Sequence, residues 1–587
     1  MKHLGLLLSC ATLGALASPL AAQDTAAPAA APATGELNLE RSDNATVNLV
    51  RLLVQQGVIP RDAAVELIRQ AEAEARQARA QTAAVTAAAS EIRAAAQAEL
   101  ALSESDVRVT YVPEHVRQEI AADVRNELAA EARAQGLASP GKDTPSWVSR
   151  FRPFGDLRVR GQASFYDEGN NNTGAFPDFN AINTGSPFDV AGSVFSPQLN
   201  SDQDRDQFNL RARFGFETDL DEGYIVGIRL ATGNSASPVS TNQTVGSPGN
   251  FSRYSIWLDQ AFLRWESRAT SDFSAKVYAG RFENPFYKTD ITWDSDIQLD
   301  GFAFQGGHQT TGSIKTFFTA GFFPVFNTAL NFPANQPDKF ESTDRYLSAA
   351  QLGADYQITQ NTRLKAALAY YYFSDIQGEL SDPFTPLNAS DAGSTDSRRP
   401  TFAQKGNTYM PLRDIVPTPA NNFGAINQFQ YFGLASDFAP AAFTAQLDLN
   451  HYEPFQISFF TEAVKNLAYD KTEVEASAVN NLSGTGGHLG GDFAWTLGVN
   501  VGQAVLQERG DWRIGLSYRY QESDSFVDGF VDSDFGLGGT NLQGYIIGAQ
   551  YTLTPRIFLS ARWLSASEVD GPAFSADLFQ FDVNSRF

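Results

Sequence analysis

Basic side chains recur at every second position in several segments of the sequence. Arg158 and Arg160 alternate with apolar residues, and so do Arg211 and Arg213. Because side chains that alternate along a β-strand share one face, each segment would carry a basic face and an apolar face. Such rows can hold or steer charged molecules. The candidate wall residues are Arg158, Arg160, Arg211, Arg213, Arg229, Arg264, Lys276, Arg363, Lys365, Arg513, Arg519 and Arg562. The alternative for any one of them is a solvated or ion-paired residue that only supports the structure.

An acidic stretch follows one of these segments. Its carboxylates are Glu283, Asp290, Asp294, Asp296 and Asp300. If this stretch folded inward opposite a basic wall, it would set a transverse electric field across a constriction, since rings of charge are a means of selectivity. The alternative is an exposed acidic loop.

Patterns for other chemistry are missing from the sequence. No Gly-x-Ser-x-Gly elbow is present, and the histidines do not have the spacing of zinc ligands. We therefore expect no cofactor, no metal and no catalytic residues. An enzyme stays a minor alternative because a catalytic triad need not be local in sequence.

The elements that carry these residues read as β-strands of about ten residues, the length of a tilted transmembrane strand. Residues 157–166, 208–217, 363–372 and 512–520 all alternate apolar and polar positions, and aromatic residues gather toward the strand ends. A soluble β-sandwich also alternates. Placing each arginine in hydrocarbon would cost about 2–4 kcal/mol at midplane, so the basic face must face water.

The connections between the strands alternate between short and long, which favours a membrane barrel over a sandwich. Short ones include residues 219–222 and 359–361, and long ones include 167–206 and 374–440. Counting in this way predicts an all-β barrel of sixteen antiparallel strands with both ends on the periplasmic side. The segments 402–412 and 428–437 could add a hairpin, which gives eighteen strands as the alternative.

The region before the barrel has a different composition. Residues 1–22 have the charged start and apolar run of a secretory signal peptide, which contains the only cysteine, Cys10. Residues 23–38 are an Ala/Pro-rich linker. Residues 39–146 have an Ala-rich helical pattern whose apolar stripe is too narrow for a globular core, so we expect a coiled coil or a solvated helical spacer. The barrel takes residues 147–587.

Composition excludes two classes of protein. Lys and Arg number 44 against 67 Asp and Glu, and this acidic balance argues against nucleic acid as a partner. After the N-terminus no apolar run approaches the roughly 20 residues of a membrane-spanning helix, which excludes a helical membrane protein. The charge balance leaves the choice between anion and cation selectivity open.

The C-terminal strand alternates Phe579, Phe581, Val583 and Phe587 with polar residues. A terminal Phe on such a strand resembles the signal read by the outer-membrane barrel assembly machinery. The alternative is an ordinary last strand.

Several segments together resemble the bacterial "putative porin" family. They are Thr46–Leu53, Tyr111–Glu114, Phe154–Gly161, Gly280–Phe286 with Trp293–Asp296, and Val464–Leu467. The resemblance runs from about Leu39 to Phe587 and implies a Gram-negative outer-membrane porin, with an N-terminal periplasmic region and no known solute.

From this we expect passive diffusion of small hydrophilic solutes or ions through an aqueous lumen. The expected partners are outer-membrane lipid and lipopolysaccharide, the assembly machinery and two further copies in a homotrimer, with peptidoglycan as a further contact of the helical region. The second hypothesis is an envelope tether whose barrel is only an anchor.

Overall fold

The computed structural model describes residues 150–192, 195–267, 272–328, 332–341 and 343–587. The predicted signal peptide, linker and helical region lie outside these residues. The chain divides into two compact units, residues 1–139 and 140–587, and the fold below is that of the second. Among the described residues, no helix is long and apolar enough to cross a membrane.

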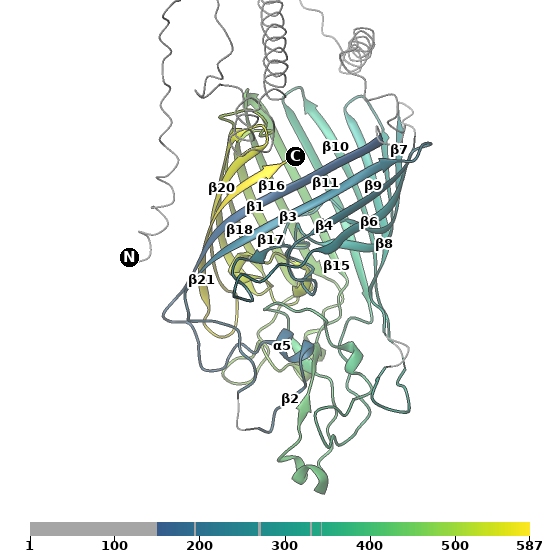
Figure 1. Ribbon diagram of the computed structural model, residues 1–587, viewed down its shortest axis with the longest axis vertical. Coiled ribbons are helices and arrows are strands. Elements are labelled where there is room, and N and C mark those ends of the chain that lie inside the picture. Colours follow the sequence, from purple (N-terminus) through teal and green to yellow (C-terminus); the bar gives the residue numbers. More distant parts are fainter. Residues whose placement is uncertain (1–149, 193–194, 268–271, 329–331, 342) are drawn as a thin grey trace, which may run out of the picture. The chain divides into compact units, whose positions relative to one another are not determined.

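Sixteen strands form a closed antiparallel barrel (Figure 1). The first eight are β1 (Phe151–Tyr166), β3 (Arg205–Asp219), β4 (Tyr224–Ala231), β6 (Trp257–Glu266), β7 (Phe273–Glu283), β8 (Gln298–Gln309), β9 (Ile314–Phe326) and β10 (Arg345–Thr359). The others are β11 (Thr362–Ser374), β15 (Pro440–Tyr452), β16 (Phe455–Asn466), β17 (Phe493–Gln503), β18 (Trp512–Gln521), β19 (Leu542–Thr554), β20 (Ile557–Glu568) and β21 (Ser575–Arg586). The register from Asp156↔Arg586 to Tyr166↔Ala576 joins β1 to β21 and closes the barrel.

The prediction of sixteen strands is confirmed, and the eighteen-strand alternative is wrong. The segments that could have formed an extra hairpin contain β12 (Tyr409–Pro411) and β14 (Phe432–Leu434), which pair with each other in a separate two-stranded sheet. A second small sheet pairs β2 (Phe188–Asp189) with β13 (Phe429–Gln430). β5 (Gln243–Thr244) extends the main sheet beside β3. These pieces belong to the long connections and add no barrel strand.

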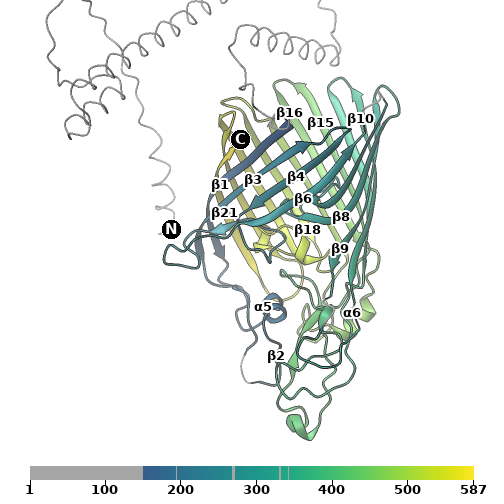
Figure 2. The same cartoon turned by 45° about the vertical axis from the view of Figure 1, so that its right-hand side comes forward.

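The two ends of the barrel differ. The long connections gather at one end, with β2 and the short helices α5 (Phe179–Thr184) and α6 (Lys471–Ser477) (Figures 1 and 2). The short turns and the C-terminus lie at the other end. This is the arrangement that the alternating connection lengths predict.

The outer surface of the barrel carries the apolar half of the alternating pattern. Leu157, Val159, Phe302, Leu516 and Phe581 are all exposed on it. The basic half of β1 points inward instead, and Arg160 is only 2% exposed. One strand therefore presents an apolar face and a charged face to two different surroundings, as its period of two requires.

The interior near the long connections is filled by an apolar cluster. Trp293 packs against Tyr371 of β11, with ring centroids 5.5 Å apart, and against Phe526, at 5.1 Å. Phe286 and Phe373 belong to the same cluster and are buried. These residues come from connections as well as strands, so long loops fold back into the barrel and burial of their aromatic rings fixes them there.

Candidate functional site

Two connections meet inside the barrel, residues 284–297 between β7 and β8 and residues 522–541 between β18 and β19. The backbone N–H of Asp294 donates to the carbonyl of Phe530 at 2.8 Å, and that of Asp532 donates to the carbonyl of Asp290 at 3.1 Å. The N–H of Ser533 donates to Oδ2 of Asp294 at 3.0 Å. The two connections, called here the inward loops, therefore support each other.

Polar side chains of the barrel wall hold the first inward loop in place. Glu462 of β16 accepts from the N–H of Thr289 at 2.9 Å and from the hydroxyl of the same residue. Gln351 of β10 accepts from the N–H of Tyr287 at 2.8 Å and donates to its carbonyl at 2.7 Å. Because buried backbone groups need partners, these side chains fix the path of the loop across the lumen.

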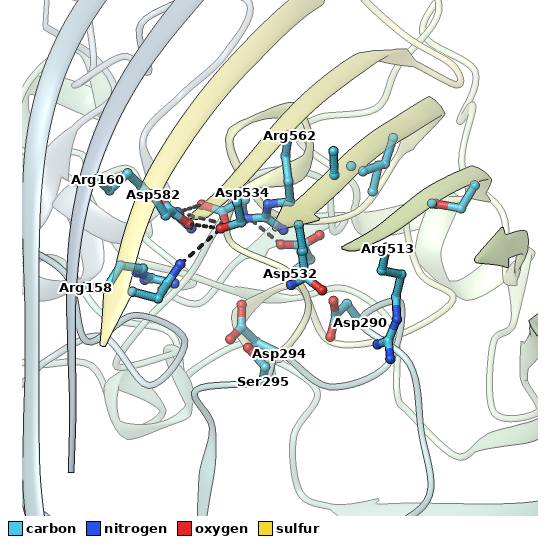
Figure 3. A pocket seen from close by; sticks show the side chains of 18 of the residues that line it. Arg158, Arg160, Asp290, Asp294, Ser295, Arg513, Asp532, Asp534, Arg562 and Asp582 are labelled. Carbon is cyan, nitrogen blue, oxygen red and sulfur yellow. Dashed lines mark hydrogen bonds and ion pairs between the residues drawn. The ribbon is translucent and has the colours of Figure 1, made fainter. Parts of the chain in front are cut away.

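A polar cavity of about 420 Å³ lies between the inward loops and the barrel wall (Figure 3). The wall contributes four guanidinium groups, and the loops contribute most of the carboxylates. The charged lining residues are Arg158, Arg160, Arg513 and Arg562 with Asp290, Asp294, Asp296, Asp532, Asp534 and Asp582.

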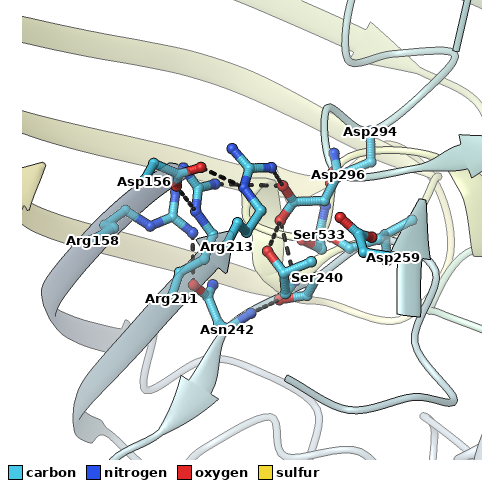
Figure 4. A network of polar contacts seen from close by, with 12 residues as sticks. Asp156, Arg158, Arg211, Arg213, Ser240, Asn242, Asp259, Asp294, Asp296 and Ser533 are labelled. Atoms are coloured by element: carbon cyan, nitrogen blue, oxygen red, sulfur yellow. Dashed lines mark hydrogen bonds and ion pairs between the residues drawn. The ribbon is translucent and has the colours of Figure 1, made fainter. Parts of the chain in front are cut away.

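Asp296 of the first inward loop is the centre of one ion-pair network (Figure 4). Its Oδ1 lies 3.4 Å from Arg211 and 3.3 Å from Arg213, both on β3. Its Oδ2 accepts from the N–H and hydroxyl of Thr241 at 3.2 and 3.1 Å. Asp156 of β1 pairs with the same two arginines at 2.9 and 2.7 Å. Burial alone would raise the pKa of Asp296, but the surrounding guanidinium groups hold it below its usual value.

A second network joins the wall to the other inward loop (Figure 3). Arg160 pairs with Asp582 of β21 at 2.7 Å and with Asp534 at 3.2 Å, and Arg562 also pairs with Asp534. Beside it, Arg519 pairs with Asp532 of the loop at 3.0 Å. Both inward loops are thus attached to the wall by carboxylates that guanidinium groups hold.

Two lining arginines and two lining aspartates, Asp290 and Asp294, stand apart from these pairs. Arg158 donates to Oδ1 of Asn242 at 2.6 Å, and Arg513 donates to the carbonyl of Gln503 at 2.9 Å. Within the described part of the chain, neither arginine has a carboxylate within ion-pair distance. In the same residues, neither Asp290 nor Asp294 has a cation within that distance. Burial, followed by the charges of nearby carboxylates, raises the pKa of Asp294 to about 8. These four groups are the ones left to act on a passing solute.

Most of the predicted wall cations are ion-paired, which is the alternative that the sequence leaves open for each of them. Beyond the two networks, the pairs are Arg229 with Asp259, Arg264 with Glu217, Lys276 with Glu266 and Arg363 with Asp355. Lys365 lies over the ring of Tyr287, 4.0 Å from its centroid. The acidic partners of these cations lie on other strands of the barrel. The alternating pattern within a single strand does not show which acids those are.

The structure brings only part of the predicted acidic loop together. Asp290, Asp294 and Asp296 line the cavity. Glu283 is an exposed residue at the end of β7, and Asp300 is exposed on β8, where it pairs with Arg281 at 2.6 Å. The turn into the lumen begins after Glu283 and ends before Asp300, so these two acids lie outside the cavity.

Sequence reasoning missed the acids that complete the site. Asp156, Glu217 and Asp582 each lie at an inward position of their own strand, as their arginine partners do on theirs. The alternation of apolar and polar residues in the sequence could therefore have predicted that they face the lumen. Glu462 is likewise an acid on the inward face of β16. Asp534 lies in a connection with no alternating pattern, and nothing local indicated that it would reach the wall.

Three residues of the predicted assembly signal lie on β21, and Phe587 follows directly after its end. Phe581, Val583 and Phe587 are exposed. Phe579 contacts the ring of Trp563, with centroids 6.1 Å apart. The backbone of Phe587 exchanges two hydrogen bonds with Gly155 of β1, at 3.0 and 3.1 Å. A Cβ on Gly155 would come within 2.7 Å of the Phe587 ring, so only glycine leaves the terminal ring its place.

Comparisons with known proteins complete these observations. Residues 43–587 match the family described as "Putative porin". No curated protein sequence matches the chain.

Among solved structures, the outer membrane channel DcaP of Acinetobacter baumannii is 11% identical with a TM-score of 0.34, over 74% of this chain and 97% of that chain. OprB of Pseudomonas putida is 12% identical with a TM-score of 0.39, over 76% and 96%. OmpT of Vibrio cholerae, with its loop L8 deleted, is 10% identical with a TM-score of 0.34, over 75% and 100%. The family match extends over all of the barrel strands. The chain therefore belongs to the "Putative porin" family, as an outer-membrane β-barrel with a channel role.

Proposed function

We propose that the protein is a passive diffusion channel for small hydrophilic solutes or ions, and that the inward loops set its selectivity. The observation that carries the proposal is the polar cavity of about 420 Å³, in which loop carboxylates face wall guanidinium groups. Such an arrangement gives a field across the path of a solute, and charged constrictions are a means of selection.

The fixed position of the inward loops supports this role. Wall side chains and the second inward loop hold the backbone of the first inward loop. Its carboxylates therefore stay at set distances from the wall. Preorganised charges of this kind discriminate between ions without having to rearrange.

The experiment compares the purified protein with a double variant, Asp294→Asn with Asp296→Asn, in planar bilayers under a KCl gradient. Loss of Asp296 leaves Arg211 and Arg213 with one carboxylate less, so the reversal potential should move toward anions. Glu283→Gln is the matched control, since Glu283 belongs to the same segment but is exposed away from the cavity. Unchanged conductance and selectivity in the double variant would show that the loop is not the constriction.

The second candidate is an envelope tether whose barrel is an anchor. The apolar cluster that packs the barrel interior near the long connections favours it. Liposome swelling with neutral sugars separates the two, because a channel admits the smaller sugars and an anchor admits none.

The proposal also includes partners. We propose that residues 39–146 stay periplasmic, and that they hold three copies together or contact peptidoglycan. The acids of the long loops would face lipopolysaccharide at the outer surface, where divalent cations can bridge carboxylates and phosphates.

A further inference from the structure

A second cavity, of about 290 Å³, lies at the end of the barrel that carries the long connections. Its wall is mostly aromatic and aliphatic, and its aromatic lining residues are Trp293, Phe323, Phe326, Phe373, Phe402 and Phe530. The volume lies near the lower limit of small-molecule sites, which is roughly 300 Å³. A ligand with a single ring fits that size.

One charged side chain lines this cavity without a counter-ion. Arg345, the first residue of β10, is 4% exposed. Its Nη2 donates to the carbonyls of Ser397 at 3.2 Å and Arg399 at 3.1 Å, and its Nη1 donates to that of Arg398 at 3.4 Å. Among the described residues, its Nε has no acceptor. In the part of the chain that the structure describes, no carboxylate lies within ion-pair distance of it. A buried cation without an anion is costly, so such a group points to a missing partner.

The other charges near the cavity do not supply that partner. Asp300 is paired with Arg281 at 2.6 Å, and the carboxylate of Asp528 accepts from the hydroxyl of Tyr409 at 3.0 Å. Arg399 adds a further positive charge, with its guanidinium over the ring of Tyr431. Arg398 and Arg399 both act on Arg345 as like charges, so the end of the cavity at Arg345 favours an anion.

We propose that this cavity binds a small carboxylate that carries one apolar ring. Its carboxylate would accept from the guanidinium of Arg345, and its ring would pack among Phe326, Phe402 and Phe530. Phe326 already lies under the guanidinium, 4.5 Å from it, so the charged and apolar parts of the ligand would meet adjacent walls. The site is separate from the charged cavity between the inward loops and does not depend on the channel proposal.

Saturation-transfer NMR on the full-length protein in detergent micelles tests this, with benzoate as the probe. Benzoate should bind saturably, and neither benzyl alcohol, which lacks the charge, nor acetate, which lacks the ring, should displace it. Arg345→Gln should weaken binding by about 10- to 100-fold, because a hydrogen bond to a charged group is lost. Arg253→Gln, which changes an exposed arginine of another long connection, should bind as the unchanged protein does.

Arg345 also holds backbone carbonyls, so its loss could affect folding. Ala236→Trp avoids this, because Ala236 is exposed and lines the mouth of the cavity, where an indole would block entry. Loss of benzoate binding in this variant, with the heat-modifiable barrel band retained, supports the site. Unchanged binding in both variants, or equal binding of benzyl alcohol, would overturn it.

Discussion

Raising the pH should add negative charge to the cavity between the inward loops at Asp294. Its pKa of about 8 means that the carboxyl is mostly protonated at pH 6 to 7 and mostly ionised at pH 9. Because the pKa of this buried acid is raised, its carboxyl stays neutral below about pH 8 and becomes negatively charged above it. Asp294→Asn should remove this titration and leave the others in place.

The size of the effect follows from Coulomb's law. A unit charge about 6 Å from a passing ion contributes about 0.7 kcal/mol at the dielectric constant of water and about 3 kcal/mol at an effective value of 20. The same charge attracts a cation and repels an anion, so the two contributions add in the cation-to-anion permeability ratio. Since about 1.4 kcal/mol corresponds to a factor of ten, this ratio should rise roughly tenfold or more between pH 6 and pH 9.

The assay is the reversal potential of single channels under a KCl gradient, measured at several pH values. The unchanged protein should become more cation-selective with a midpoint near pH 8, and Glu283→Gln should behave in the same way. An equal shift in Asp294→Asn, or no shift in the unchanged protein, would refute the assignment of this titration to Asp294.

Three further changes test other parts of the account. Glu462→Ala leaves the backbone N–H of Thr289 without its acceptor, at a cost of about 1–3 kcal/mol, so the inward loop should loosen and single-channel current noise should rise; quiet, unchanged traces would contradict this. Deleting Phe587 should reduce the amount of barrel assembled in outer membranes, measured as heat-modifiable protein, and normal assembly would show that the terminal ring is dispensable. Deleting Leu39–Gly136 should change the oligomeric state on native gels while the barrel still conducts, and loss of the barrel itself would contradict the division into two regions.

The sequence predicts the barrel well because its strands obey one simple rule. Every strand must present an apolar face and a polar face. The length of each connection indicates at which end of the barrel that connection lies. The structure of the long segment 375–439 could not be predicted from its sequence. Its strands β12 and β14 have only three residues each, too few to show an alternation of apolar and polar residues, and they pair with one another instead of with the barrel.

The candidate site was predicted only in part. The arginine rows and three loop aspartates come from local spacing, so they could be found. Most of the arginines are ion-paired, and this could not be predicted because it depends on which strands are neighbours and on the register between them. Arg160, for example, lies opposite Asp582 on the neighbouring strand. Packing of Trp293 against Phe526 brings the two inward loops together, and no pattern in either loop alone specifies the other.

The most direct test of the central claim places single cysteines at two neighbouring positions of β18 in a Cys10→Ser background. Leu516 is 51% exposed on the outer face, and Ser517 lies next to it on the opposite face of the strand, which also carries the buried Arg519. In conducting proteoliposomes, a water-soluble, membrane-impermeant thiol reagent should modify Ser517→Cys and reduce the current, and it should leave Leu516→Cys unmodified. Modification of Leu516→Cys alone, or no effect on current at Ser517→Cys, would contradict a barrel whose apolar face meets lipid and whose charged face lines the solute path.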